Sequence, residues 1–270
     1  YQENVELPFF KYYLKGIGTP KSFEALAFDI GADKWNEFTT WPPQNVKSET
    51  LYFRENGKLN FEKPNANNSF EEYVSDPNKP VPFTSEISNK RSREYMIEDQ
   101  RFASRRPDVI SYETNPLTED ITLAGPIIAD LFVSTTGTDA DYVVKLIDVY
   151  PDSLSDYILN GKDVKIGGYQ MLVRAEVMRG KYRNSFEAPT PFIPNQTTQV
   201  KFELPDVMHT FKKGHKIMVQ VQNSWFPLVD RNPQTFTNIY KAKEEDFIKT
   251  TNRIYHDKDH SSGIIVNVLK

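Results

Sequence analysis

Cysteine is absent from the 270-residue sequence. Disulfides, thiolate metal sites and a cysteine nucleophile are therefore excluded together. The absence leaves the compartment open, because cytoplasmic proteins and exported or periplasmic proteins both occur without cysteine.

The serine motif of an acyl-transfer enzyme is missing as well. Serine hydrolases place the nucleophile in Gly-x-Ser-x-Gly, on a strained turn beside backbone donors, and no such pentapeptide occurs. The four histidines and the nearest serines are His209, His215, His256, His260, Ser224, Ser261 and Ser262. Serines in polar loops are typical turn and cap residues. We therefore expect this chain to carry no catalytic residue of its own.

Long apolar runs and an excess of one charge are also lacking. No run of about 18 apolar residues, the length of a transmembrane helix, is present, and the net charge of -4 creates no cationic field. Membranes and nucleic acid are therefore poor candidates for partners. The polar start, Tyr1 to Glu6, lacks a signal peptide and an initiating Met. We expect the chain to begin inside a longer polypeptide.

Two groups of side chains resemble metal sites without the required spacing. His256 and His260 would share one face of a helix, yet Gly263 and the apolar run after it indicate a loop entering a strand. Four aspartates do not fit the calcium-binding EF-hand loop; they are Asp139, Asp141, Asp148 and Asp152. We expect structural histidines, solvated or salt-bridged carboxylates, and neither a metal nor another cofactor.

What is present favours a mainly β protein with a large core. Hydrophobic residues make up 38% of the sequence and charged residues 26%, far from a disordered composition. Short apolar runs alternate with turn signals, as in a sandwich or barrel. The expected strands are 24–30, 51–53, 58–61, 108–112, 121–135, 142–150, 171–178, 199–204, 216–221 and 264–268. With so few helices between them, pairing should be antiparallel, and the expected fold is a two-sheet, galactose-binding-like jelly-roll β-sandwich.

Local signals add two helices and a hairpin. Apolar residues from Glu3 to Leu14 have near-helical spacing before Gly16, which predicts a short amphipathic helix. A second helix is expected over Lys243–Thr251. Asn56-Gly57 between apolar runs is a strong hairpin signal.

Residues 65–106 are rich in Pro, Asn, Ser and charge, and are expected to form one long irregular loop. A loop of this length is usually functional or packed on another surface. Basic residues between Lys90 and Arg106 alternate with acidic ones. This mixture favours a salt-bridged interface over nucleic-acid binding.

Several motifs follow one another in the order and spacing of one hydrolase family. They are Tyr73-Val74-Ser75-Asp76-Pro77, Pro80-Val81-Pro82, Glu98-Asp99-Gln100-Arg101, Arg106-Pro107-Asp108-Val109, the run from Thr138 to Asp152, the run from Gly214 to Val221, Trp225-Phe226-Pro227 and Asp230-Arg231-Asn232-Pro233. Over essentially its whole length the chain resembles the carboxyl-terminal domain of the X-Pro dipeptidyl-peptidase family. That family includes bacterial cocaine esterase, α-amino-acid ester hydrolases and glutaryl 7-aminocephalosporanic acid acylases.

The resemblance implies a division of labour within a longer bacterial polypeptide. An α/β-hydrolase domain would supply the Ser, Asp and His triad, and a helical cap would cover it. Residues 1–22 would be the terminal helix of that missing domain, and residues 23–270 the jelly roll. The implied partners are the hydrolase and cap domains and, through them, a small ester, amide or short peptide substrate. Self-association into a homo-oligomer is left open.

The resemblance also implies a loop that reaches the substrate. In cocaine esterase a jelly-roll loop reaches the acyl pocket, and the corresponding positions here are Asn89 and Lys90, next to Arg91. The esterase has apolar residues there, so the resemblance does not extend to its preference for aromatic acyl groups.

A docking surface for the hydrolase domain is a separate hypothesis. Trp225 and Phe226 would supply apolar area, and Asp230 with Arg231 a charge-assisted pair. The alternative is that these residues only turn a corner of the sandwich.

The leading function is thus a non-catalytic β-sandwich of a serine hydrolase acting on ester or amide bonds, which stabilises the hydrolase domain and shapes its pocket. The alternative is a free-standing carbohydrate-binding jelly-roll module, since Trp41, Trp225 or Phe226 could stack on sugars.

Overall fold

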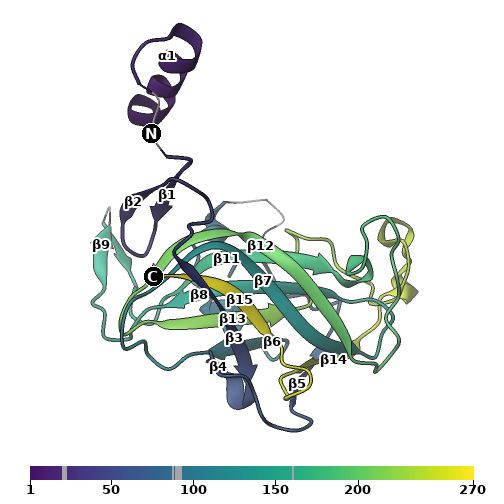
Figure 1. The fold of residues 1–270 in the computed structure, drawn as a ribbon. Coiled ribbons are helices and arrows are strands. Elements are labelled where there is room, and N and C mark those ends of the chain that lie inside the picture. The colour runs from purple at the N-terminus through teal and green to yellow at the C-terminus, as the bar shows by residue number, and fades with distance from the viewer. Residues whose placement is uncertain (20–22, 87, 89–92, 160) are drawn as a thin grey trace.

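The longest stretch of alternating residues forms the strand on which the fold is built, β7 (Ile121–Thr135) (Figure 1). One edge of β7 pairs with β12 (Thr198–Phe211). The other edge pairs with β15 (Gly263–Leu269) and, at its end, with β14 (Thr250–Tyr255). The computed structural model describes every residue except 20–22, 87, 89–92 and 160.

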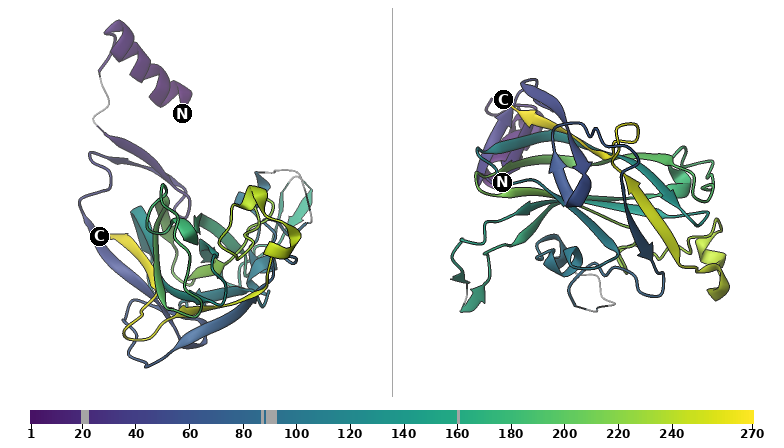
Figure 2. Two further views of the ribbon diagram at one scale, coloured as in Figure 1. Left: turned by 90° about the vertical axis from the view of Figure 1, so that its right-hand side faces the viewer. Right: turned by 90° about the horizontal axis from the view of Figure 1, so that it is seen from below.

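The strands form two layers, which Figure 2 shows edge-on. The front sheet contains these four strands together with β3 (Val46–Arg54), which pairs with β15, and β5 (Phe70–Ser75), which pairs with β14. The back sheet has the antiparallel order β11 (Gln170–Arg179), β8 (Asp141–Val149), β13 (Lys216–Gln222) and β6 (Val109–Glu113). Short β4 (Lys58–Asn60) pairs with β3 and meets β6 at one parallel bridge. The layers are therefore one sheet folded over itself, which confirms the mainly β jelly-roll prediction.

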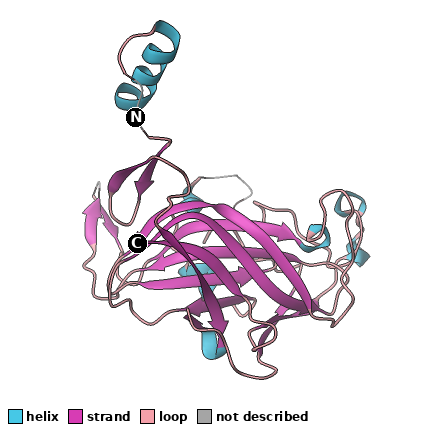
Figure 3. Cartoon of the chain, viewed as in Figure 1, coloured by secondary structure: helices cyan, strands magenta, loops and turns pink. Residues whose placement is uncertain are grey.

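The connections contain a small hairpin and short helical turns (Figure 3). The hairpin pairs β9 (Tyr157–Leu159) with β10 (Lys162–Val164). The turns are η2 (Glu55–Gly57), η3 (Glu94–Met96), α2 (Arg101–Ser104), η4 (Gly180–Tyr182), η5 (Ile239–Lys241) and η6 (Glu244–Asp246). Among the described helices, none has the length and apolarity needed to cross a membrane.

The inner faces of the two sheets bury an apolar core. Leu123 and Leu131 of β7 face Tyr142, Val144 and Leu146 of β8 in one cluster, and all five side chains are inaccessible to solvent. Because side chains alternate along a strand, one parity supplies the core. Leu123 and Leu131 are of one parity in β7, and Tyr142, Val144 and Leu146 are of one parity in β8.

The outer face of the back sheet is buried too. Val143 packs with Phe83 and Trp225, and Lys145 lies beside it without solvent exposure. The cover comes from the described residues 81–86 and 93–104 and from the distant segment 223–229, which cross this face. Both faces of the back sheet are therefore buried, the inner face against the front sheet and the outer face under the covering segments.

A helical extension precedes the sandwich. A π-helical turn, η1 (Gln2–Glu6), runs into α1 (Leu7–Lys15), which ends at Gly16 in the left-handed region with φ 65°. Glycine adopts this conformation without a Cβ penalty. The predicted helix is confirmed, and Figure 1 shows it standing away from the sandwich. No residue of α1 is buried.

The hairpin of β1 (Ala25–Asp29) and β2 (Lys34–Phe38) links this helix to the sandwich. The buried Asp29 carboxylate accepts hydrogen bonds from the Thr210 backbone N–H at 2.9 Å and from its hydroxyl at 2.5 Å. A Cβ at Gly31 would lie 1.8 Å from the Thr210 carbonyl oxygen. Only glycine lets the hairpin approach β12 this closely.

Two predictions about the connections were wrong. Lys243–Thr251 is not a helix: η6 ends at Asp246, and the chain is extended by Thr250, because β14 pairs with both β5 and β7. Residues 65–106 are not irregular throughout, because they contain β5, η3 and α2. Edge pairing, which the local sequence does not signal, decides both cases.

Candidate functional site

The histidines at the β12–β13 turn hold the sandwich together. Asp148 Oδ2 lies 2.9 Å from His209 Nε2, and Asp148 Oδ1 lies 2.8 Å from His215 Nδ1. Although burial opposes it, hydrogen bonding to the two histidines keeps the pKa of Asp148 below its ordinary value. Asp148 is thus a buried tie between β8 and this turn.

The second pair of histidines lies in the loop before β15. His256 is buried, with Nδ1 3.0 Å from Ser69 Oγ, and burial lowers its pKa. Asp257 Oδ1 accepts the backbone N–H groups of Asp259 and His260, both at 2.8 Å. These are the contacts of structural histidines in a hydrogen-bonded turn. Within the described residues no three metal-ligating side chains converge.

Two of the candidate serines bind backbone. Ser224 Oγ accepts the Val81 N–H at 2.8 Å, and Ser262 Oγ accepts the Phe132 N–H at 2.9 Å. A serine used in this way holds a strand or segment in place. Neither contact pairs a serine with a histidine base.

The buried aspartates at the start of β8 are paired with cations. Asp141 Oδ2 lies 3.2 Å from Arg179 Nη2, and Asp141 Oδ1 accepts from Asn232 Nδ2 at 2.7 Å. Burial raises the pKa of Asp141 to about 6 despite these partners. Asp139 lies 3.6 Å from Lys181 Nζ, and burial raises its pKa as well. The cluster is a salt-bridged network, as the sequence predicted.

The proposed docking residues lie next to the segment that covers the back sheet. Trp225 is only 6% exposed, with Tyr95 packed edge-on 5.5 Å away, whereas Phe226 is 38% exposed. Within the described residues, Arg231 donates to the Pro77 carbonyl at 2.9 Å rather than pairing with Asp230, whose carbonyl accepts from Arg179. These contacts serve this chain, and a role in docking another domain stays a prediction.

The substrate-loop positions Asn89, Lys90 and Arg91 lie outside the described residues. The segment that follows them is held by the motif Glu98 to Arg101. Asp99 Oδ1 accepts the Gln170 N–H at 3.2 Å, and Gln100 Oε1 accepts from Lys145 Nζ at 3.0 Å. The motif Glu98 to Arg101, which in the sequence was only a mark of the family, therefore attaches this segment to strands β8 and β11 of the back sheet.

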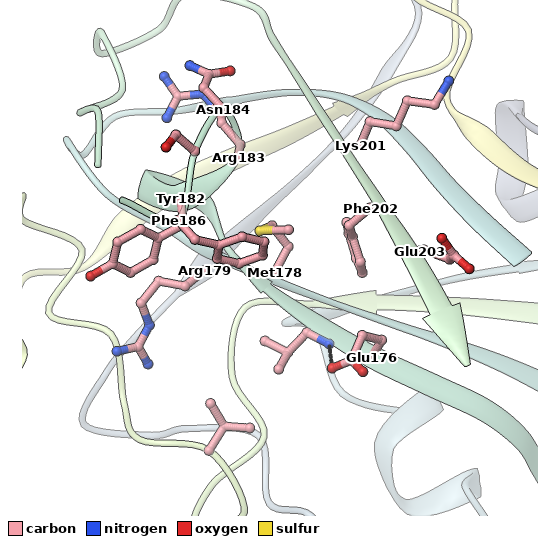
Figure 4. Close-up of a pocket in the computed structure, with 13 residues that line it drawn as sticks. Glu176, Met178, Arg179, Tyr182, Arg183, Asn184, Phe186, Lys201, Phe202 and Glu203 are labelled. Atoms are coloured by element: carbon pink, nitrogen blue, oxygen red, sulfur yellow. Dashed lines mark hydrogen bonds between the residues drawn. The ribbon is translucent and has the colours of Figure 1, made fainter. Parts of the chain in front are cut away.

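A cleft of about 660 Å³ opens between β11 and β12 (Figure 4). Met178 and Phe202 line it beside the exposed Phe186. Its arginines are already engaged: Arg183 donates to the Gly180, Thr190 and Pro191 carbonyls, and Arg179 pairs with Asp141. No local pattern indicates this cleft, because its walls come from strands of different sheets, β11 of the back sheet and β12 of the front sheet.

Many of the exposed large apolar side chains among the described residues lie near the N-terminus. We define the N-terminal apolar surface as Leu7, Phe9, Phe10, Tyr13, Leu14 and Ile17 of the helical segment with Phe28, Ile30 and Trp35 of the hairpin, each 38–76% exposed. An apolar surface of this kind marks an interaction site.

Comparison with known proteins identifies the relatives of this chain. Residues 7–265 match the family described as the X-Pro dipeptidyl-peptidase C-terminal non-catalytic domain. Cocaine esterase from Rhodococcus sp. (strain MB1 Bresler) is 29% identical over 275 residues, which cover 97% of this chain and 45% of that protein.

Two solved structures agree in fold and sequence. An aminopeptidase from the marine sediment archaeon Thaumarchaeota archaeon is 41% identical, with a TM-score of 0.90 over 100% of this chain and 44% of that one. An α-amino acid ester hydrolase is 41% identical, with a TM-score of 0.91 over 98% of this chain and 44% of that one. The chain spans less than half the length of each of these relatives.

These matches overturn the alternative of a free-standing carbohydrate-binding module, because the relatives are hydrolases. The geometry gives a physical reason: Trp225 is buried, and the Trp41 indole donates to the Asp206 carboxylate. The chain therefore belongs to the X-Pro dipeptidyl-peptidase C-terminal non-catalytic domain family.

Proposed function

We propose that this chain supports an α/β serine-hydrolase domain of the same polypeptide and forms part of its substrate pocket. The relatives include an esterase, an aminopeptidase and an amino acid ester hydrolase, so the parent reaction would be hydrolysis of ester or amide bonds. The triad would come from the hydrolase domain, through an acyl-enzyme. The sandwich would stabilise the hydrolase domain and form one wall of its substrate pocket.

The N-terminal apolar surface carries this proposal. A nine-residue helix is marginal alone in water, yet α1 exposes Phe9 at 52% and Leu14 at 76%. Covering these side chains would stabilise the helix by about 25 cal/mol for each Å² of apolar area removed from water. We infer that the hydrolase domain covers them, with residues 1–22 belonging to that domain and residues 23–270 to the sandwich.

The loop at Asn89 to Arg91 is the proposed contribution to the pocket. The motif Glu98 to Arg101 fixes the segment after it, and Phe83, hydrogen-bonded to the Phe226 carbonyl, fixes the segment before it. Both flanks are thus anchored on one rigid face. Rigid anchoring is what a substrate-positioning loop requires.

The test compares the isolated chain with the full-length polypeptide on p-nitrophenyl esters and aminoacyl amides. We expect turnover only by the full-length protein. The double variant Phe10→Asp/Leu14→Asp should lose most of that activity by separating the domains. Tyr240→Asp, a change at a distant residue that is 85% exposed, is the matched control. Turnover by the isolated chain, or full activity in the double variant, would refute the proposal.

A further inference from the structure

A lysine on the outer face of the back sheet is buried, and no carboxylate among the described residues forms an ion pair with it. Lys145 has no solvent-exposed surface, and its Nζ donates to Gln100 Oε1 at 3.0 Å. The same Nζ lies 5.1 Å from the ring centroid of Trp225 and 5.8 Å from that of Phe102. Burying an ammonium is costly unless its partners are well placed. The stability of the buried ammonium therefore depends on Gln100, Trp225 and Phe102 keeping their positions.

Gln100 attaches the covering segment, residues 93–104, to the back sheet. Its backbone N–H donates to the Gln170 carbonyl on β11 at 3.0 Å, and its carbonyl accepts from the N–H groups of Ala103 and Ser104 in α2. Gln100 is 1% exposed. The side-chain bond to Lys145 thus fixes the residue that lies between η3 and α2 in the chain.

The part of the segment before Gln100 lines a surface cleft of about 360 Å³. Ile97 and Glu98 form one wall, and residues 83–86 form the other. Glu98 Oε1 accepts the Ser85 N–H at 3.1 Å, which ties the walls together. A shift of Gln100 would move this wall as a unit.

We propose that Lys145 is a positioning residue, which fixes residues 94–104 on the back sheet by donating to Gln100 and so sets the cleft wall formed by Ile97 and Glu98. The anchoring stands on the contacts above. The link to the substrate rests on the proposed function.

The titration of Lys145 makes the opening of this segment depend on pH. Burial lowers its pKa to about 7, while the Glu98 carboxylate opposes the shift. Its other neighbours are the Gln100 amide, the Gln220 amide across the strand pair, and the rings of Trp225 and Phe102. Opening the segment returns the lysine to water, so opening takes up a proton above pH 7.

The experiment is hydrogen exchange of residues 94–104 in the full-length polypeptide. Gln100→Leu leaves the buried ammonium without its acceptor, so exchange there should accelerate at least tenfold at pH 7. The acceleration should shrink between pH 7 and 9 as the lysine loses its charge. The double variant Gln100→Leu/Lys145→Met removes both polar groups and should restore protection to within about threefold. Lys201→Met, in an exposed pair with Asp130, is the lysine control.

Equal exchange in all variants, or acceleration without pH dependence and without rescue, overturns the anchor. Kinetics test the link to the substrate separately. We expect kcat/KM to fall about tenfold in Gln100→Leu and to recover in the double variant. If exchange behaves as stated while kcat/KM is unchanged, the anchor stands and the substrate-wall part of the proposed function is wrong.

Discussion

The two faces of the back sheet are both buried, yet they differ in chemistry. On the inner face, Tyr142, Val144 and Leu146 pack into an apolar core. On the outer face, Lys145 and Gln220 lie beneath a covering segment and bind amides and rings. Apolar burial is non-directional and stacks the layers. Polar burial is directional, so it selects which segment covers the sheet and in what position.

The largest effect should come from breaking the inner face. Leu146→Ala removes a fully buried side chain and should lower the free energy of unfolding by about 3 kcal/mol through lost burial and a cavity. Denaturant unfolding measures it. Exchange of residues 94–104 relative to the rest of the chain should not change, and a selective change there would erase the distinction between the faces.

The polar burial on the outer face should make the free energy of unfolding depend on pH. The pKa of Lys145 is about 7 in the folded chain, against an ordinary value of 10.5, so the unfolded state binds more protons between these two pH values. Stability therefore rises with pH in that window. We expect the wild type to gain about 2 kcal/mol between pH 7 and 9 relative to Lys145→Met. If the free energy of unfolding of the wild type and of Lys145→Met changed in parallel with pH, the lowered pKa of a buried Lys145 would be contradicted.

A second polar anchor sharpens the comparison. Asp29→Ala removes the acceptor of the two bonds from Thr210 and should cost about 1 kcal/mol. Limited proteolysis should show the hairpin of β1 and β2 opening first. Glu37→Ala, at an exposed position of the same hairpin, is the control. A loss spread evenly over the sandwich would argue against a local anchor.

The smallest effect is expected at the surface. Lys201 pairs with Asp130 at 3.1 Å, but the lysine side chain is 49% exposed. Solvent screens such a pair, so Lys201→Ala should change stability by less than about 0.5 kcal/mol. Thermal unfolding checks this value. A change as large as that of Asp29→Ala would mean that burial does not separate the two kinds of contact.

The inner face was predictable from sequence, and the outer face was not. In 121–135 the apolar residues Leu123, Leu131 and Val133 fall on one parity, and period-two patterns report burial of one side. By the same pattern Lys145 falls on the parity that usually faces solvent. Its burial depends on Gln100, 45 residues earlier, and no local signal reports that contact.

The candidate site divides in the same way. Motif order was enough to indicate the family, because each motif is a local string. The roles of its residues needed coordinates: Trp225 is an interior ring, and Arg231 is bound to Pro77. Extended pairing of β5 with β14 was equally hidden, because the apolar residues of Phe70–Ser75 do not alternate with period two and the partner strand begins only at position 250.

The place of β15 between β3 and β7 has a consequence for synthesis. The last strand of the sandwich is an inner one, pairing with residues 46–52 on one side and 123–130 on the other. Contacts this distant along the chain make folding slow, and the front sheet stays split until residues 263–269 have left the ribosome. A truncated product would expose two unpaired edges, which are templates for aggregation. The fold therefore makes solubility depend on the synthesis of residues 263–269.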